Sequence, residues 1–283
     1  MELIYTSLKD AGITASFVLL YIVLFLLAKW FKDFLTSYKI NDELSRKDNL
    51  AVSLTMCGYY FATAAIFVGA FLGPTGNLIN DLIAVGGYSI LGIIILNVSR
   101  YLNDKAILRK FANIEQLTKE QNAAVGAVQL GTYVATGLIA AGAIAGQDGG
   151  ILSFIIFFIL GQISLLLFSL IYDFFTPYSV HAELEKQNVA AGVAFSGTLI
   201  ALGIIVMNGV TGDFVNWIES ITHFLIVITT AFVFLPIVRI LMDKLVIAGD
   251  DLSREITEDK NIGAGFLEAC VAISFAVILN VLL

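Results

Sequence analysis

Residues 183–210 read ELEKQNVAAGVAFSGTLIALGIIVMNGV, a short charged segment followed at once by an apolar run that is long enough to cross a membrane. The apolar run opens at Asn188 and has small residues at the second, fourth and ninth positions after it, Ala190, Gly192 and Gly197. Asparagine is favoured at helix N-caps, and small residues let membrane helices approach closely. The segment therefore predicts a membrane helix that begins at Asn188 and packs tightly against its neighbours.

The same arrangement occurs four times, at a spacing of about 70 residues, and a period of this length sets the architecture. The asparagine that opens the second apolar run of each repeat is Asn49, Asn122, Asn188 or Asn261. The aspartate that closes the first apolar run is Asp33, Asp104, Asp173 or Asp243. Each repeat is therefore predicted to be a hairpin of two membrane helices, and all four hairpins are inserted the same way round.

The composition is that of a membrane protein. Of the 283 residues, 58% are hydrophobic and 14% are charged, whereas soluble domains have about 25% charged residues. Backbone polar groups cannot stay unpaired in lipid, so apolar stretches of roughly 20 residues span it as helices. The predicted spans are 13–32, 50–72, 80–102, 123–145, 151–172, 189–209, 220–242 and 262–283. The predicted fold class is an all-α polytopic membrane bundle of eight transmembrane helices, arranged as four parallel two-helix repeats.

The four repeats form two similar halves, residues 1–146 and residues 147–283. Residues 33–38, DFLTSY, match residues 173–178, DFFTPY, and corresponding residues of the halves lie 139 or 140 positions apart. Each half has an even number of spans, so both halves run the same way through the membrane. We therefore expect pseudo-twofold halves, with a nested twofold or pseudo-fourfold axis along the membrane normal.

The two helices of each hairpin differ in bulk. First spans are rich in large side chains, as in FIIFF at residues 154–158, whereas second spans are built from small residues after their asparagine. Small residues favour close helix contacts in membranes. We therefore expect the second spans to form an inner cluster and the first spans to face lipid.

Lysine and arginine predict the orientation. Of the 16 such residues, only Lys9 lies outside the loops and helix ends that join spans 1–2, 3–4, 5–6 and 7–8. The positive-inside rule places those four loops in the cytoplasm and both termini outside. The chain begins Met-Glu, with no basic region before a first apolar run of full length, so we expect no cleaved signal peptide.

The loop after the third span has a pattern of its own. Apolar residues recur there at helical spacing among Lys and Glu, at Ile107, Phe111, Ile114 and Leu117. This pattern predicts a short amphipathic helix on the membrane surface.

The repeated polar residues are the first candidate site. Lys29, Arg100 and Arg239 each precede an aspartate by one helical turn, so interfacial ion pairs are one interpretation. The other is a cytoplasmic vestibule whose carboxylates concentrate cations, although the neighbouring cations weaken it. The asparagines are either N-caps or amides that converge on an axis to coordinate an ion or water. The candidate vestibule consists of Asp33, Asp104, Asp173, Asp243, Asn49, Asn122, Asn188 and Asn261.

Glu268 is the sharpest single candidate. It lies seven residues into the last span, roughly 10 Å along a helix, where an acid is costly and is a functional hypothesis by default. Its counterpart in the first half is Gln129. The two side chains are predicted to face each other across the pseudo-twofold axis, either as a hydrogen bond that joins helices or as a site for a proton or cation.

Several classes of function are excluded or disfavoured. A net charge of −7 without basic runs argues against nucleic acid. The sequence has no nucleophile elbow, phosphate loop or metal-ligand cluster, so we expect no enzyme, no catalytic residue, no metal and no cofactor. Cys57 and Cys270 are interpreted as small apolar side chains, and Asn97, Gln162 and His223 as structural.

One motif resembles a known family. Glu43-Leu44 is followed by Asn49-Leu50-Ala51, and Glu183-Leu184 by Asn188-Val189-Ala190. Gln116-Leu117 with Asn122-Ala123-Ala124 is similar, whereas the fourth copy departs with Asn261-Ile262-Gly263. A Glu-Leu pair before an Asn-x-Ala helix start resembles the bacterial DUF350 family, a domain of unknown function that some proteins carry in tandem. The resemblance covers almost the whole chain, and it implies a location in the bacterial inner membrane but no established activity.

Two hypotheses about function remain open. The first is a channel or transporter for a small cation or proton, which requires a polar lumen on the second spans. The alternative is a non-transporting scaffold or sensor, which requires a dry helix cluster and binds a cytoplasmic protein partner through the loops. The lipid bilayer, a homo-oligomer and a cytoplasmic protein are the candidate partners.

Overall fold

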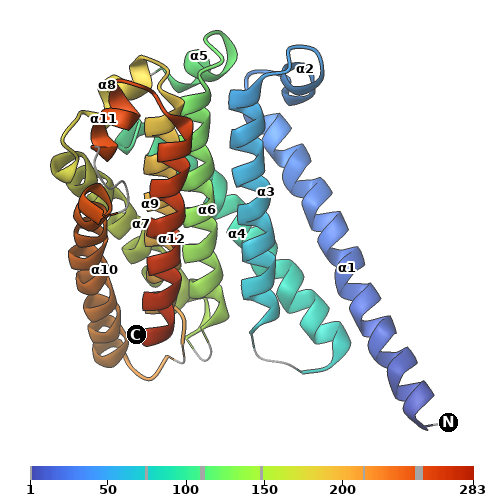
Figure 1. The fold of residues 1–283 in the computed structure, drawn as a ribbon. Coiled ribbons are helices and arrows are strands. Elements are labelled where there is room, and N and C mark those ends of the chain that lie inside the picture. The colour runs from blue at the N-terminus through green and yellow to red at the C-terminus, as the bar shows by residue number, and fades with distance from the viewer. Residues whose placement is uncertain (1, 74–75, 109–111, 147–148, 213, 246–250) are drawn as a thin grey trace.

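The computed structural model describes residues 2–73, 76–108, 112–146, 149–212, 214–245 and 251–283 (Figure 1). The described part is all-helical and contains no strand. Its long helices are α1 (Glu2–Leu35), α3 (Leu50–Phe71), α4 (Leu78–Ala106), α6 (Ala123–Ala145), α7 (Gly150–Phe175), α9 (Val189–Val210), α10 (Trp217–Leu245) and α12 (Ile262–Leu282). Its short helices are α2 (Ile40–Ser45), α5 (Asn113–Thr118), α8 (Val180–Glu185) and α11 (Leu252–Thr257). All eight long helices are apolar enough to cross a membrane, which confirms the predicted fold class.

The helix that opens each hairpin is longer than its apolar run. α3, α6, α9 and α12 begin where the sequence predicts, directly after an asparagine. By contrast α1, α4, α7 and α10 continue for about one turn beyond the predicted spans. That extra turn contains charged residues, such as Asp33 and Asp104, which hydropathy assigns to the loop. In α4 this turn is tied to the protein, since Asp104 pairs with Arg100 and accepts from Gln129 of α6.

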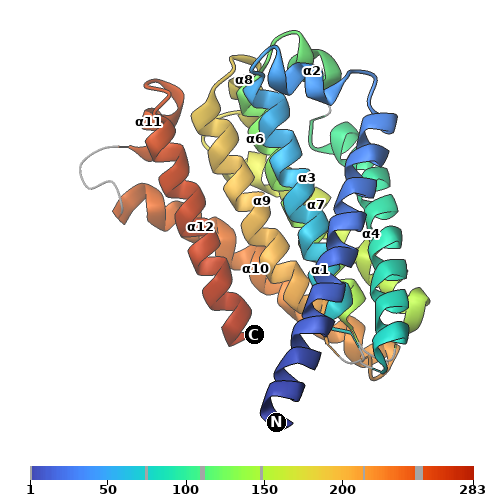
Figure 2. The same cartoon turned by 90° about the vertical axis from the view of Figure 1, so that its right-hand side faces the viewer.

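The four helices that close the hairpins form a row. α6 packs against α3, α9 against α6, and α12 against α9, in chain order (Figures 1 and 2). α3 and α12 therefore lie at opposite ends, and the row does not close around an axis. Within the most apolar window of each helix, 83% of residues are buried in α6 and 78% in α9, but only 50% in α3 and 39% in α12. The expected inner cluster is thus an open row with two inner members.

A second layer lies against this row. α4 packs on α3 and α6, α7 on α6 and α9, and α10 on α9 and α12 (Figure 2). α1 contacts α4 and one edge of α3, and only 11% of its most apolar window is buried. The predicted exposure of the first spans to lipid is therefore strongest for α1.

Neighbouring helices in the row are in direct backbone contact. A Cβ atom on Gly126 would lie 2.5 Å from the carbonyl oxygen of Ala51, and one on Gly203 would lie 2.6 Å from the Cα of Ala135. Real Cβ atoms do not approach other atoms so closely, so these positions require glycine. This packing leaves no lumen along the described contacts between helices of the row.

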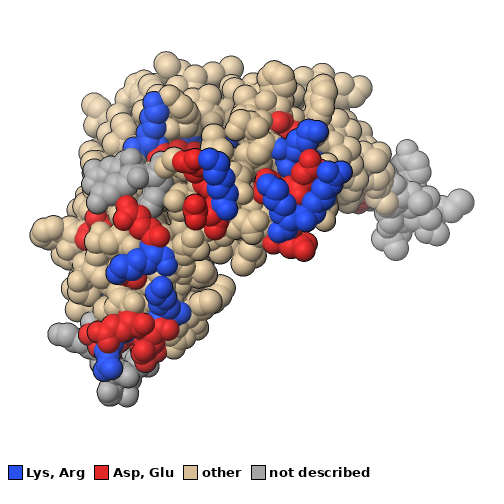
Figure 3. Space-filling view, turned by 90° about the horizontal axis from the view of Figure 1, so that it is seen from above, with Lys and Arg blue, Asp and Glu red and all other residues tan. Residues whose placement is uncertain are grey.

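The two ends of the bundle differ. The short-helix end carries α2, α5, α8 and α11, and charged side chains gather there, with both signs interspersed (Figure 3). The turn end carries the short connections between hairpins and both termini (Figure 1). The predicted amphipathic helix is shorter than expected: Ile107 caps α4, and Leu117 of α5 is fully buried against protein. Phe111 lies outside the described residues.

Candidate functional site

The four repeated asparagines lie at the short-helix end and cap the inner helices. The side chains of Asn49, Asn122, Asn188 and Asn261 accept hydrogen bonds from backbone amides in the first turn of α3, α6, α9 and α12. The predicted N-caps are therefore confirmed. The residue before each asparagine has a positive φ, between 48° and 55°, at Asp48, Gln121, Gln187 and Lys260. This left-handed residue turns the chain from the short helix into the inner helix.

Three asparagines also join one repeat to the next. The Nδ2 of Asn49 donates to the carbonyl oxygen of Leu117 at 2.7 Å, and that of Asn122 donates to Leu184 at 2.8 Å. Asn188 donates in the same way to the carbonyl oxygen of Ile256 at 2.7 Å. Each acceptor lies in the short helix of the following repeat. The amides are thus used as structural clips along the row, and they do not converge on a common axis.

Two of these asparagines also hold a buried acid in their own repeat. Asn49 donates to Glu43 at 2.9 Å, and Asn188 donates to Glu183 at 2.8 Å. Burial raises the pKa of Glu43 and Glu183, but hydrogen bonds from the asparagine and from Lys47 or Lys186 outweigh burial. The pKa of each carboxyl is therefore lowered from its ordinary value, and both acids bind as carboxylates.

The three aspartates whose side chains are described do not share one site. Asp104 lies 3.4 Å from Arg100, which confirms that predicted ion pair. Asp33 is half-buried, and among the described ion pairs none joins it to Lys29. Asp173 accepts a hydrogen bond from the backbone amide of Val180 at 3.1 Å. The side chain of Asp243 lies outside the described part of the chain. Those aspartates whose side chains are described therefore have separate local environments.

The second half of the molecule contains a buried ion pair, which we call the second-half cluster. Arg239 of α10 lies 2.8 Å from Glu268 of α12, and the two side chains are 8% and 1% exposed. Tyr172 of α7 donates to the same carboxylate at 2.8 Å, and Arg239 donates to Ser253 at 3.2 Å. A buried acid needs such partners, because an unpaired charge is strongly disfavoured away from water.

The first half contains a related group, the first-half cluster. Gln129 of α6 donates to Asp104 at 3.3 Å and accepts from Thr55 of α3 at 3.0 Å. Lys32 of α1 is fully buried, and its Nζ donates to the hydroxyl of Tyr133. The same Nζ lies 4.7 Å from the ring centroid of Tyr133. Because Arg100 also pairs with Asp104, this cluster contains two basic groups for one acid.

A comparison of the two clusters corrects one prediction. Gln129 and Glu268 occupy the same place in their halves, but they bond different partners and do not form the predicted pair. Arg100 corresponds to Arg239, and Lys32 corresponds to Tyr172. In the first half the acid, Asp104, lies on the same second-layer helix as Arg100, whereas in the second half the acid, Glu268, lies on the inner helix α12.

Sequence reasoning did not identify Lys32 or Tyr133. Lys32 stands near the end of an apolar run, next to Asp33, where a lysine usually reaches the headgroups. The one available signal was the alignment of the two halves, in which Lys32 corresponds to Tyr172, 140 positions later. Its complete burial follows from the packing of Tyr59 and Tyr133, which no local pattern reveals.

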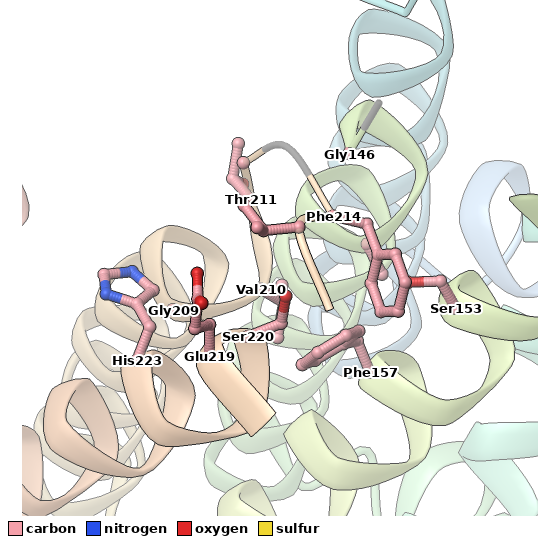
Figure 4. Close-up of a pocket in the computed structure, with 13 residues that line it drawn as sticks. Gly146, Ser153, Phe157, Gly209, Val210, Thr211, Phe214, Glu219, Ser220 and His223 are labelled. Carbon is pink, nitrogen blue, oxygen red and sulfur yellow. The ribbon is translucent and has the colours of Figure 1, made fainter. Parts of the chain in front are cut away.

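The remaining polar residues in the spans have local partners. Asn97 donates to the carbonyl oxygen of Ile93 at 2.8 Å, and Gln162 accepts from Asn103 at 3.3 Å. His223 is exposed and lines a hollow of about 300 Å³ at the turn end, together with Glu219 (Figure 4). No group of three metal-ligating side chains occurs among the described residues. The two clusters are therefore the chief concentration of chemistry inside the spans.

Comparison with known proteins agrees with this architecture. A family model described as Domain of Unknown Function (DUF350) matches residues 6–144 and again residues 148–283. A UPF0719 transmembrane protein of Aquifex aeolicus (strain VF5) is 23% identical over 253 residues, which cover 87% of this chain and 90% of that protein. No solved structure matches the chain. The protein is thus a multi-pass membrane protein that belongs to the DUF350 family and contains the domain in two tandem copies.

Proposed function

We propose that the protein is a membrane scaffold that does not conduct ions as a single chain. The observation that carries this proposal is the backbone contact along the row of inner helices. A Cβ on Gly192 would lie 2.5 Å from the carbonyl oxygen of Ala124, and one on Gly265 would lie 2.3 Å from that of Ala190. A transport path on these helices needs a polar lumen, and such packing leaves no room for one.

The charges inside the spans support the same proposal. Glu268 is neutralised by Arg239, and Asp104 is paired with Arg100 and bonded to Gln129. A carboxylate that already has a cation and a hydrogen-bond donor attracts a mobile cation weakly. The capping asparagines are likewise occupied by backbone amides.

We also propose that the short-helix end faces the cytoplasm of a bacterium and that it is the partner-binding surface. Lysine and arginine are concentrated at this end, as the positive-inside rule requires for a cytoplasmic face. Exposed ion pairs such as Arg46–Asp42 and Lys119–Glu115 cover it. The clips between repeats hold the four short helices in a fixed order, so they present one continuous surface to a protein partner.

A second candidate function rests on one observation. Lys32 is a fully buried basic group whose hydrogen bond goes to a tyrosine and not to a carboxylate. A group of that kind can exchange a proton, with Asp104 and Tyr133 beside it. On this alternative the first-half cluster moves protons and the inner row is only its frame.

The test is ion flux in proteoliposomes, with empty liposomes and an added ionophore as controls. The scaffold proposal expects wild-type protein to show no cation or proton flux under an imposed voltage. Glu268→Gln, and a variant with Asp33, Asp104, Asp173 and Asp243 changed to Asn, should equal wild type. Flux that is present in wild type and lost in a folded variant would overturn the proposal, and its loss in Lys32→Met would favour proton transfer. Folding is checked by size exclusion.

The partner surface has a separate test. A photo-crosslinking amino acid at Arg46 or Lys186, on the short-helix end, should capture the same cytoplasmic protein in living cells. The matched position Asn216, on the turn end, should not capture it. Equal capture from both ends would contradict the proposal that the short-helix end is the partner surface.

A further inference from the structure

The inner row uses one helix contact three times, always head to tail. Positions are counted from the capping asparagine of each inner helix. The second residue of one inner helix packs on the fourth residue of the next, in the pairs Ala51–Gly126, Ala124–Gly192 and Ala190–Gly265. The ninth residue packs on the eighth residue of the next helix, in the pairs Gly58–Leu130, Gly131–Ser196 and Gly197–Ala269. Each inner helix therefore has an outgoing face toward the next helix and an incoming face toward the previous one.

The outgoing face of α12 is uncovered. The thirteenth residue also packs on the fifteenth of the next helix, in the pairs Ala62–Gly137 and Ala135–Gly203. By this register the outgoing face of α12 consists of Gly263, Cys270 and Ser274, and all three residues are exposed. A Cβ on Gly263 would meet only the Oδ1 of Asn261, at 3.1 Å. The corresponding residues Ala51, Ala124 and Ala190 are all fully buried or nearly so.

The incoming face of α3 is uncovered as well. By the same register it consists of Ser53, Cys57 and Ala64. Cys57 is exposed, and the other two are half-buried. The residues that correspond to Cys57 in the inner members of the row, Leu130 and Ser196, each contact a glycine of the preceding helix.

Asn261 lacks the clip that the other three asparagines make. Its Nδ2 donates to Glu255 at 2.7 Å, but it has no carbonyl partner in a following short helix among the described residues. The residue of the first repeat that corresponds to the acceptors Leu184 and Ile256 is Leu44, in α2. At the α12 end of the row, the Nδ2 of Asn261 therefore has no clip partner among the described residues. At the α2 end, the carbonyl oxygen of Leu44 stands where the other repeats have a clip acceptor.

α1 also lacks a neighbour that its counterparts have. α4, α7 and α10 each lie in a groove between two inner helices, whereas α1 has only α3 on its side of the row. A further inner helix beside α3 would complete that groove. This observation is independent of the small residues, because it concerns the second layer.

We propose that the uncovered faces bind each other in successive copies of this chain, so that α12 of one copy packs on α3 of the next. The register of the internal contacts places Cys270 of one copy beside Cys57 of the other, and Asn261 beside the carbonyl oxygen of Leu44. The contact joins unlike faces, so each added copy leaves one face of each kind free. The copies therefore close into a ring or continue as an open chain. The proposal is independent of whether the protein conducts ions.

The contact between copies is wider than the contacts inside a chain. Ser53 stands where α6, α9 and α12 have glycine, and Cys270 stands where α3, α6 and α9 have glycine. A side chain at these positions keeps the backbones further apart. The residues are still small enough for a close helix pair, which fits a contact between separable subunits.

The two native cysteines provide the test. Full-length protein in native membranes is treated with copper phenanthroline, which oxidises two adjacent thiols to a disulfide, or with a short bis-maleimide. Wild type should give dimers and higher multiples on a denaturing gel. Cys57→Ser and Cys270→Ser should each lose all cross-linked species. When these two variants are co-expressed, they should give dimers and nothing larger, because one retains Cys270 and the other retains Cys57.

Each other outcome contradicts the proposal. Dimers from Cys57→Ser alone or from Cys270→Ser alone would mean that like faces meet. A wild type that stays monomeric with both reagents would mean that the faces do not meet. Chance collisions are measured with Val98→Cys in the Cys57→Ser and Cys270→Ser double variant, since Val98 is 58% exposed on α4, away from both faces. Cross-linking of this control to the level of wild type would also overturn the proposal.

Discussion

At the scale of single residues, Glu268 and Arg239 neutralise each other where water does not reach them. Breaking a buried ion pair by removing one partner typically costs about 3–5 kcal/mol. We therefore expect Glu268→Gln to lower the thermal unfolding temperature in detergent substantially. The double variant Arg239→Leu with Glu268→Gln should recover part of the loss, since it removes both charges.

The control for that prediction is an exposed pair. Arg254 and Glu258 lie 3.0 Å apart, and their side chains are 60% and 68% exposed. Because an exposed pair contributes little, Glu258→Gln should leave the unfolding temperature close to that of wild type. If Glu258→Gln and Glu268→Gln lowered the unfolding temperature equally, the buried pair would not stabilise the protein more than the exposed pair does.

The acids that the asparagines hold predict a dependence on pH. The folded-state pKa of Glu43 and Glu183 is lowered from the ordinary value of 4.5, so their stabilising effect is complete above that value. It is lost as the pH falls through the lowered pKa. Wild type should therefore lose stability below about pH 4.5, and the double variant Glu43→Gln with Glu183→Gln should lose less over the same interval.

The measurement is the unfolding temperature between pH 7 and pH 3. Glu185→Gln is the matched control, because Glu185 is exposed in the same short helix as Glu183. Its curve should follow that of wild type. If the double variant and wild type changed in parallel, the carboxylates would not be the groups that titrate.

Single residues also show how far sequence reasoning reaches at the site. Glu268 could be found because an acid inside an apolar run is conspicuous. Its partner Arg239 could not be assigned from the sequence, because sequence separation was the only available distance and pointed to Asp243, whose side chain lies outside the described residues. Lys32 could not be found, since its burial depends on Tyr133, which is 101 positions away. Contacts between helices decide these cases.

At the scale of helices, the asparagine clips offer an internal comparison. Asn122 caps α6 and also bonds the carbonyl oxygen of Leu184, whereas Asn261 caps α12 without such a bond. Loss of a cap costs about 1 kcal/mol, and loss of the second hydrogen bond, to the carbonyl oxygen of Leu184, adds about 0.5–1.5 kcal/mol. Asn122→Ala should therefore destabilise the protein more than Asn261→Ala in denaturant titrations. Equal losses would contradict the role of the second bond.

Helix bounds were predictable to different degrees. The starts of α3, α6, α9 and α12 could be read from the capping asparagines, because a cap is a local chemical signal. The ends of α1, α4, α7 and α10 could not, because hydropathy falls at the first charged turn even where that turn is buried. Asn103 and Asp104 lie in such a turn of α4, and both have partners on α6: Asn103 donates to Thr136, and Asp104 accepts from Gln129. A polar residue thus ends an apolar run without ending the helix.

At the scale of the whole molecule, the period predicted four equivalent hairpins but not how they are arranged. Four repeats joined by equivalent contacts form a closed ring if each repeat is rotated by a quarter turn relative to the one before it. They form an open row if that rotation is smaller. The size of that turn is set by the crossing of helices at pairs such as Gly131 and Ser196, and the sequence carries no direct record of it. The inner helices therefore form an open row and not the pseudo-fourfold ring that was one of the two expected arrangements.

The orientation of the molecule is a prediction at the same scale. In a variant without native cysteines, Ser45→Cys on α2 should react with a membrane-impermeant thiol reagent only after the cytoplasmic face is opened. Thr211→Cys, at the turn end, should react in intact cells, because both ends are exposed to their own aqueous side. The reverse labelling pattern would contradict the positive-inside assignment.

The clips between consecutive repeats have a consequence for how the protein is made. Each hairpin packs chiefly on the one synthesised just before it, as α6 does on α3 and α9 does on α6. The order of translation is then also the order of assembly, and each emerging hairpin meets a docking surface that is already in the membrane. We therefore expect the row to assemble hairpin by hairpin as the chain leaves the ribosome, because each hairpin packs on one that is already inserted.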